Sequence, residues 1–393
     1  MSKTLRPSLS VCAAWLVLMA GANLATPLYA VYAERFGFSN LVLTSVFATY
    51  AVVLVPALVL FGRLSDRFGR RPVVLTGLGL ACVALVIFAA ADGPGWLFAA
   101  RAVQGLAVGT ISGAATAALV EIDPDGNRRR AALFAGLAQA GGSATGPLLA
   151  GVLAQWAPEP LQLSYFVGIA ATVGAAVLIL GVQEPVGRER EQWRIQLPRV
   201  PHEIRAPFLR VSLTAAIVWA AMGLLLSIVP SYAADLLNSE NLALLALIAA
   251  VGLLASCAAQ LVVTYRRGRP ARDEAIGLVV LGVGMIVLIV AAPLKSLPLM
   301  IVGAIAAGFG HGLAFLNAQQ ELNEVAPQER RGEVTAAFIA CIYALLAMSV
   351  VGSGLLDEYL SLTAAVSVVA ACLATLAAAV AVWHARVARH VVR

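Results

Sequence analysis

Charged residues are scarce in this sequence: Asp, Glu, Lys and Arg together make up 12% of its 393 residues. A soluble domain carries about 25% charged and about 45–50% apolar residues. Here 61% of the residues are hydrophobic and the mean hydropathy is +0.88. The composition therefore excludes a protein that faces water over most of its surface and indicates a membrane protein. Its apolar residues suffice for about twelve spanning helices of roughly 20 residues each.

Lysine is nearly absent, since only Lys3 and Lys295 occur. Neither follows a glycine, so the Gly-Lys pair of a phosphate-binding P-loop is missing. An ATP-driven pump with its motor in this chain is therefore excluded. The cysteines are unpaired by spacing and lie inside apolar runs, which favours packing over a disulfide or metal role; they are Cys12, Cys82, Cys257, Cys341 and Cys372.

Histidine is also scarce, with four residues in the chain. We expect His202, His384 and His390 in inner loops, which leaves His311 as the only histidine within a span. The sequence contains neither a Gly-x-Ser-x-Gly elbow nor an HExxH helix, so a membrane-embedded enzyme would lack its nucleophile or its zinc site. We therefore expect no enzymatic activity, no cofactor, no metal and no nucleic-acid partner.

Apolar runs of spanning length fall into two groups of six. The first group covers residues 9–33, 41–62, 73–91, 96–120, 131–155 and 161–182. The second group covers residues 209–233, 242–264, 274–293, 297–320, 333–356 and 361–384. The first run is longer than a secretory signal and eleven more follow it, so we interpret it as an uncleaved span.

Basic residues are distributed asymmetrically along the chain. With the amino terminus placed inside, all but three of the 27 Lys and Arg residues fall in inner segments. The exceptions are Arg35 and Lys295 in outer loops and Arg101 within the fourth span. The positive-inside rule then predicts a multi-pass protein of the cell (inner) membrane with both termini in the cytoplasm.

The two groups of spans are related by a weak repeat. An offset of 203 residues, in numbering alone, places Gly105 on Gly308 and Gly109 on Gly312. The longest hydrophilic stretch lies between the groups. We therefore predict an N-terminal six-helix bundle over 1–182, a cytoplasmic linker over 183–208 and a C-terminal six-helix bundle over 209–393. Two parallel six-helix repeats are typical of secondary transporters, with a substrate site at their interface.

The inner loop after the second span reads GRLSDRFGRR over residues 62–71. This loop resembles the G-x-L-x-D-R-x-G-R-R signature of the major facilitator superfamily. The resemblance covers the whole chain and implies an all-α membrane fold of 12 transmembrane helices in two pseudo-symmetric six-helix bundles. Within the superfamily, the sequence resembles the 12-span drug:proton antiporter group. The gating residues that it implies are Gly62, Asp66, Arg67, Gly69, Arg70 and Arg71.

Asp66 is the one carboxylate of this signature. In the family the matching aspartate docks at the amino end of the eleventh helix, here near Gly332, and latches the cytoplasmic side shut. The alternative is a solvated charge in a turn. The second-half copy has Tyr265 in place of Asp66, so we expect a latch on one side only.

Arg101 lies within the fourth span, where it begins the sequence Arg-x-x-Gln-Gly with Gln104 and Gly105. This resembles a second superfamily motif, common in proton-coupled members. A guanidinium at mid-helix costs at least about 2.5–3.5 kcal/mol, so Arg101 should face the protein interior and have a partner. The alternative is that Arg101 snorkels to the outer interface.

The fifth span contains a run of small residues over 141–151, GGSATGPLLAG. It resembles the antiporter motif of drug exporters, G-x-x-x-G-P-x-x-G-G, with Ala150 in place of one glycine. The matching residues are Gly142, Gly146, Pro147 and Gly151. Small residues allow close helix approach and proline introduces a kink, which together suit a gating interface. The alternative is a tight helix pair with no special function.

No carboxylate lies in the middle of an apolar run; all 21 acidic residues are expected at span ends or in loops. Glu34 and Asp235 stand at outer ends, and Glu121 and Glu321 at inner ends. If protons drive transport, the titrating group is therefore Asp66, one of these carboxylates or His311, whose side chain titrates near neutral pH. The residues expected to take part in proton coupling are Arg101, Gln104, Asp66 and His311.

The resemblance implies a central cavity lined by the first, fourth, seventh and tenth helices. The polar or aromatic residues expected in this cavity, besides Gln104, are Asn23, Tyr29, Trp219, Ser227, His311 and Asn317. Gln139 of the fifth helix is a further candidate. Each of them is equally consistent with helix packing. A few hydrogen-bonding groups in an apolar chamber suit a lipophilic or amphiphilic substrate better than a sugar or a phosphate.

The leading hypothesis is a secondary active transporter, expected to be a monomer in the lipid bilayer, that exports drugs or lipophilic metabolites in exchange for protons. One alternative is an importer or facilitator of a small metabolite on the same fold. Another is a membrane sensor that transports nothing, because a fold does not fix a function.

Overall fold

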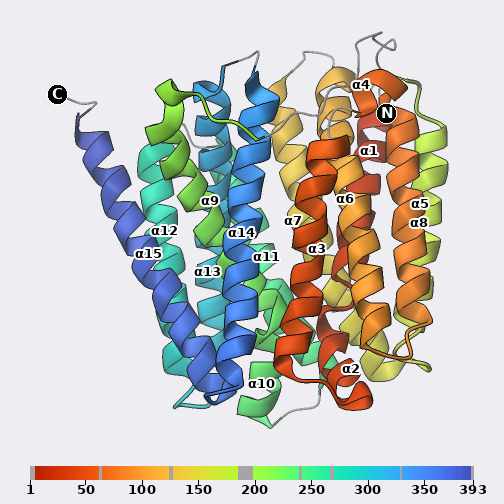
Figure 1. Ribbon diagram of the computed structural model, residues 1–393, viewed down its shortest axis with the longest axis vertical. Coiled ribbons are helices and arrows are strands. Elements are labelled where there is room, and N and C mark those ends of the chain that lie inside the picture. The colour runs from red at the N-terminus through yellow and green to blue at the C-terminus, as the bar shows by residue number, and fades with distance from the viewer. Residues whose placement is uncertain are drawn as a thin grey trace. The chain divides into compact units, whose positions relative to one another are not determined.

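The computed structural model describes residues 5–61, 64–123, 127–184, 198–238, 241–265, 270–327 and 330–390. Every regular element in these ranges is a helix (Figure 1). Twelve of these helices have 18 residues or more, which confirms the predicted all-α class and its twelve spans. Gly62 of the signature, residues 185–197 of the predicted linker and the loop residues 266–269 lie outside the described residues.

Contacts divide the chain into two compact units, the first of residues 1–28 and 49–196 and the second of residues 29–48 and 197–393. The helices from the amino terminus to residue 184 are α1 (Leu5–Asn23), η1 (Thr26–Leu28), α2 (Tyr29–Phe36), α3 (Asn40–Phe61), α4 (Leu64–Phe68), α5 (Arg70–Ala89), α6 (Pro94–Ile122), α7 (Arg128–Trp156) and α8 (Leu163–Leu180). The helices from residue 202 onward are η2 (His202–Ile204), α9 (Arg205–Ser227), α10 (Val229–Leu237), α11 (Leu242–Tyr265), α12 (Pro270–Ala291), α13 (Leu297–Val325), α14 (Arg331–Asp357) and α15 (Leu362–His390).

Eleven helical stretches among the described residues are long and apolar enough to cross a membrane. The twelfth long helix, α7, has 29 residues but opens on three arginines and is rich in glycine and alanine. At about 1.5 Å per residue it is still long enough to cross a hydrocarbon core of roughly 30 Å.

The segment 29–48 belongs to the second unit, although it follows the first span in sequence. Within that unit, Asn40 Nδ2 donates a hydrogen bond to Asp357 Oδ2 at 2.8 Å. Gly354 of α14 also lies against α3, because a Cβ on it would come within 2.9 Å of the Asn40 carbonyl oxygen. These contacts join the start of α3 to the end of α14.

The sequence repeat corresponds to a repeated packing of helices. In the first unit, Gly105 and Gly109 of α6 face α3, where a Cβ on Gly105 would lie 2.7 Å from the Tyr50 carbonyl oxygen. In the second unit, Gly308 and Gly312 of α13 face the backbone of α11 at Gly252 and Ser256. Glycine at these positions lets the two backbones of each pair approach closely.

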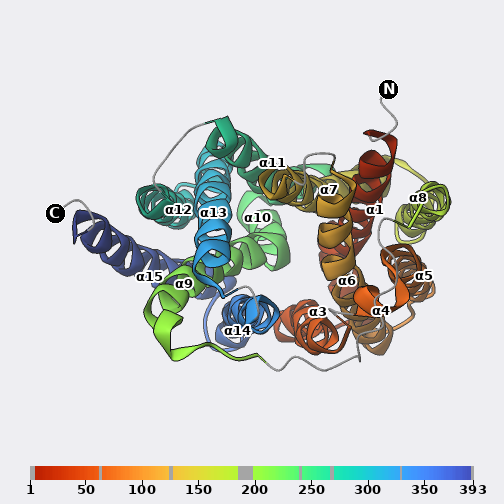
Figure 2. The same cartoon turned by 90° about the horizontal axis from the view of Figure 1, so that it is seen from above.

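The last helix, α15, packs along α12 and α9 within the second unit (Figure 2). It continues to His390, beyond the predicted end of the twelfth span at 384. The extra turns place His384 inside a helix that has neighbours on several sides.

Candidate functional site

The signature loop is organised around Arg70, the first residue of α5. Its Nη1 donates to Asp66 Oδ1 at 2.5 Å and to Ser65 Oγ at 2.6 Å. Its Nε and Nη2 donate to the carboxylate of Glu121 at 3.1 and 2.7 Å. One guanidinium thus joins α4 to the end of α6. The sequence interpretation named Asp66 and Arg70 but did not pair Glu121 with them, because Glu121 lies 51 residues away.

Gly69 and Glu184 complete this loop. Gly69 has φ +95°, a conformation that L side chains rarely adopt, and a Cβ on it would lie 2.7 Å from Glu184 Oε2. The Glu184 carboxylate accepts hydrogen bonds from the backbone amides of Arg70 and Arg71 at 2.5 and 3.1 Å. An anion is favoured at this position because unpaired amides and the helix dipole meet at the start of α5. Arg67 is exposed, with its guanidinium 5.4 Å from the Phe68 ring centroid.

Arg101 is buried, with 2% of its surface exposed. Its Nη1 donates to the Ala22 carbonyl at 2.6 Å and to Gln104 Oε1 at 2.8 Å, and Gln104 Nε2 donates to the Gly21 carbonyl at 3.1 Å. These carbonyls belong to the last turn of α1, where Pro27 follows and the helix gives way to η1. A guanidinium suits a helix carboxyl end because the carbonyls there have no partners in the helix. This geometry argues against the snorkelling alternative.

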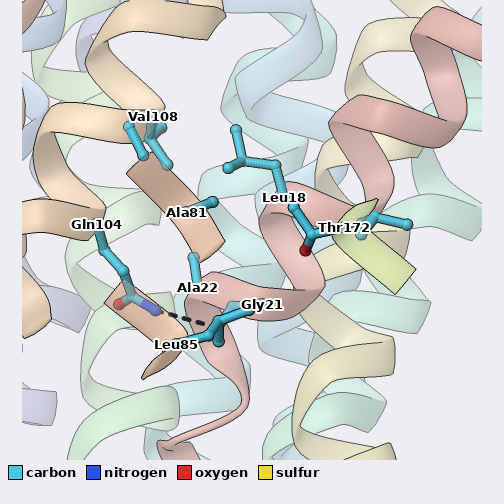
Figure 3. Close-up of a pocket in the computed structure, with 10 residues that line it drawn as sticks. Leu18, Gly21, Ala22, Ala81, Leu85, Gln104, Val108 and Thr172 are labelled. Atoms are coloured by element: carbon cyan, nitrogen blue, oxygen red, sulfur yellow. Dashed lines mark hydrogen bonds between the residues drawn. The ribbon is translucent and has the colours of Figure 1, made fainter. Parts of the chain in front are cut away.

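A small cavity lies beside this clamp of Arg101 and Gln104. Figure 3 shows Gln104, Gly21 and Ala22 at one end of it and Val108 at the other. Its walls come from α1, α5, α6 and α8, are mostly aliphatic, and leave room for about one water molecule. A substrate of drug size does not fit into this space.

The glycines of the fifth-span motif pack against α1 in the same unit. A Cβ on Gly142 would overlap the Leu16 carbonyl oxygen, and one on Gly146 would overlap the Ala20 carbonyl oxygen. Pro147 lies inside α7 and Gly151 is buried. Close packing of α7 on α1 therefore accounts for two of the motif's glycines, whereas an antiporter role for the motif stays a prediction.

We expect Gly142→Ala to destabilise the protein and Gly141→Ala to leave it unchanged or slightly stabilised. Overpacking a tight contact costs about 1–3 kcal/mol, whereas a Cβ on the neighbouring Gly141 meets nothing within 4 Å. Both changes carry the same gain in helix propensity. The apparent melting temperature in detergent should separate the variants. Equal melting temperatures would show that the α1–α7 contact is looser than described.

His311 is buried in the second unit, with 1% of its surface exposed. Its Nδ1 lies 2.8 Å from Ser256 Oγ, which accepts a hydrogen bond from Gln260 Nε2 at 3.3 Å. The His311 ring stacks on Phe315 and meets the edge of Trp219, with ring centroids 5.6 and 4.9 Å apart. The structure thus brings together two predicted residues, His311 and Trp219, and adds partners from α11 that sequence spacing could not indicate.

The remaining predicted cavity residues are placed singly. Asn23 and Asn317 each donate to the carbonyl one turn earlier on their own helix, at 2.8 and 2.7 Å. Ser227 is buried and its hydroxyl has no hydrogen-bond partner among the described residues. Tyr29 is buried at 1% exposure and Gln139 is half-buried. Their contribution to substrate binding stays a prediction.

One expectation about an ionisable group is wrong, and one burial was not predicted. His384 does not lie in a loop: it is a residue of α15 with 0% exposure, so His311 is not the only histidine within a span. Glu274 lies near the start of α12, as expected of a residue at a span end, but it is 0% exposed. Burial at a helix end depends on which helices surround it. Here His384 of α15 lies against Glu274 of α12 and Thr214 of α9.

Comparison with known proteins agrees with this architecture. Residues 11–350 match the Major Facilitator Superfamily. The cephamycin export protein CmcT of Amycolatopsis lactamdurans is 30% identical over 48% of this chain, and a triacylglyceride transporter of Mycobacteroides abscessus is 27% identical over 52%. The matched stretch spans 39% of the length of each of these relatives. The crystal structure of the human organic anion transporter MFSD10 (TETRAN) is 16% identical, covers 97% of this chain and all of its own, and superposes with a TM-score of 0.72.

The family match covers most of the chain, and the likeness in structure covers nearly all of it. Together with the spanning helices, these findings identify a multi-pass membrane transporter rather than an enzyme. The chain belongs to the major facilitator superfamily.

Proposed function

We propose that this transporter exports lipophilic or amphiphilic small molecules across the cell membrane in exchange for protons, with both chain termini in the cytoplasm. The observation that carries the substrate class is the chemistry of the polar side chains on α1, α9 and α13. Asn23, Trp219 and Asn317 are neutral, and Trp219 packs against the rings of His311 and Phe315. Neutral side chains of this kind suit a substrate that is held mostly by apolar contact, with a few hydrogen bonds.

The direction and the coupling ion have separate support. The fifth-span motif and the name of the cephamycin export protein favour export, and the triacylglyceride transporter favours a lipophilic cargo. The Arg-x-x-Gln-Gly motif, which is common in proton-coupled members of the superfamily, favours proton coupling. Its residues Arg101 and Gln104 bind the carbonyls at the end of α1, where the first spanning helix is interrupted. Exchange for protons is one way to drive export against a concentration gradient.

Accumulation in cells tests the direction and the substrate class. Cells without their own efflux pumps would express the full chain and receive a lipophilic cation, a neutral lipophilic dye or a labelled sugar. We expect the lipophilic compounds to accumulate less than in vector controls, the difference to vanish with a protonophore, and the sugar to be unaffected. Greater accumulation would favour import, and no change for any compound would favour a membrane sensor.

A further inference from the structure

The second unit contains a group of buried polar side chains of which only Glu321 was predicted from the sequence as a candidate titrating group. We call it the buried charge cluster, and its members come from four helices: Arg210 and Thr214 from α9, Glu274 from α12, Glu321 from α13 and His384 from α15. Glu274, Thr214 and His384 are 0% exposed and Arg210 is 6% exposed. The side chain of Glu321 keeps 12% of its surface exposed, so the cluster reaches the surface only there and at Arg210.

The hydrogen bonds within the cluster indicate which ring nitrogen of His384 carries a hydrogen. Thr214 Oγ1 donates to the Arg210 carbonyl at 3.1 Å, so its single hydrogen is used there. With Thr214 as the donor to the Arg210 carbonyl, we assign the hydrogen of its 2.8 Å contact with His384 Nε2 to the histidine. The same Nε2 lies 3.2 Å from Glu274 Oε2. The His384 tautomer assigned in this way carries its hydrogen on Nε2, between a hydroxyl and a carboxylate.

The formal charges of the cluster do not balance without a further proton. Arg210 Nη2 pairs with Glu321 Oε1, so the two carboxylates of Glu274 and Glu321 are matched by one guanidinium when His384 is neutral. Glu274 Oε1 has no hydrogen-bond donor among the described residues. A buried net charge is strongly unfavourable in a low-dielectric interior, and uptake of a proton removes it.

Other ionisable groups at the same ends of the neighbouring helices do not supply the positive charge that would balance the second carboxylate. They are partly or fully exposed, and Arg330 forms its own pair with Glu333 at 3.3 Å; the group comprises Arg205, Arg272, Asp273, Glu324, Arg330, Arg331, Glu333 and Arg386. The related cluster of the first unit, Asp66, Arg70 and Glu121, also has two carboxylates and one guanidinium. Its side chains are 14–31% exposed, so water can stabilise the excess charge there.

We propose that the buried charge cluster is a proton-binding site, in which one proton on Glu274, beside the Nε2–H of a neutral His384, neutralises the excess carboxylate charge. A divalent cation is the competing ligand, since ligand atoms of Glu274, Glu321 and His384 lie within 4.8 Å of one another. The proton is favoured because Arg210 already occupies Glu321 and would repel a metal ion. A role for this site in driving transport rests on the proposed function, but the binding of the proton does not.

Infrared difference spectroscopy on the full chain in lipid nanodiscs tests the proposal. A change of pH should produce the carbonyl band of a buried carboxylic acid, which shifts in D₂O. We expect Glu274→Gln to abolish this band and His384→Gln to move its midpoint. The neighbouring Asp273→Asn, on the same turn but partly exposed, should retain the wild-type band. A band unchanged in Glu274→Gln, or absent from the wild type, would overturn the assignment.

Two further measurements separate the alternatives. Zinc chloride alone would be titrated against the wild type and Glu274→Gln. Stoichiometric zinc binding lost in the variant would make this a metal site and contradict the proposal. If Glu274→Gln does not fold, the midpoint shift in His384→Gln decides in its place. If the Glu274→Gln variant lacks the band but exchanges substrate as the wild type does, the proton-binding site stands but has no role in driving transport. If the wild type shows the band but moves no protons with substrate, only the proposed function is refuted.

Discussion

Arg101→Ala is expected to lower proton-driven exchange at least about tenfold, equivalent to roughly 1.4 kcal/mol in the transport barrier. The change removes the donor to the Ala22 carbonyl and to Gln104 at the end of α1. A buried acceptor left without its donor costs about 1–3 kcal/mol. The end of α1 should therefore loosen where the first span is interrupted. Arg101→Lys should not restore exchange, because an ammonium cannot reproduce the geometry of a guanidinium.

The measurement is substrate-driven proton movement in proteoliposomes, normalised to the amount of inserted protein. Lys295→Gln serves as the matched control, since it also removes a positive charge but lies at an exposed position. Exchange in Arg101→Ala equal to that of the control would reduce Arg101 to a structural residue of the first unit. A fall in the melting temperature without a fall in exchange would lead to the same conclusion.

Asp66→Asn is expected to abolish transport while membrane insertion stays normal. Asp66 and Glu121 both bind Arg70, and the neutral amide weakens one side of this charge-assisted network. The resemblance also predicts a latch near Gly332; this latch stays a prediction, and the same change would weaken it. Because Asp66 keeps 31% of its side chain exposed, its loss should affect stability little and gating strongly.

Initial rates of efflux in cells, with surface expression checked in parallel, measure this effect. Asp92→Asn is the control, because it neutralises an exposed carboxylate of the same unit at the loop between α5 and α6. Wild-type efflux in Asp66→Asn would remove the latch from the account and leave Asp66 as a solvated charge in a turn.

The sequence was most informative where a residue conflicts with its surroundings. Arg101 stands in an apolar run, and the cost of exposing it to lipid predicts a buried position with partners, as its 2% exposure shows. Long apolar runs likewise predicted the helices, because a membrane leaves few other ways to satisfy the backbone. The identities of the partners were not predictable in the same way. The Gly21 and Ala22 carbonyls lie 83 and 79 residues from Gln104 and Arg101.

Residues near helix ends were the hardest to place. Glu184, Glu274 and His384 occur at positions where a charge normally meets water, so sequence alone gives them no special meaning. Glu184 gains its role from the amides at the start of α5, which are 113 and 114 residues away. Glu274 and His384 become significant only because α9, α12, α13 and α15 surround them. Such contacts depend on tertiary packing, which hydropathy does not encode.

Proton release from proteoliposomes on addition of a lipophilic compound tests the central claim most directly. The purified chain would be reconstituted without a membrane potential, and the internal and external pH would be followed under pH gradients of both signs. We predict proton movement opposite to the compound, reversed when the gradient is reversed and absent from Asp66→Asn liposomes. Compound flux with no accompanying proton movement, or flux of a sugar alone, would contradict the account.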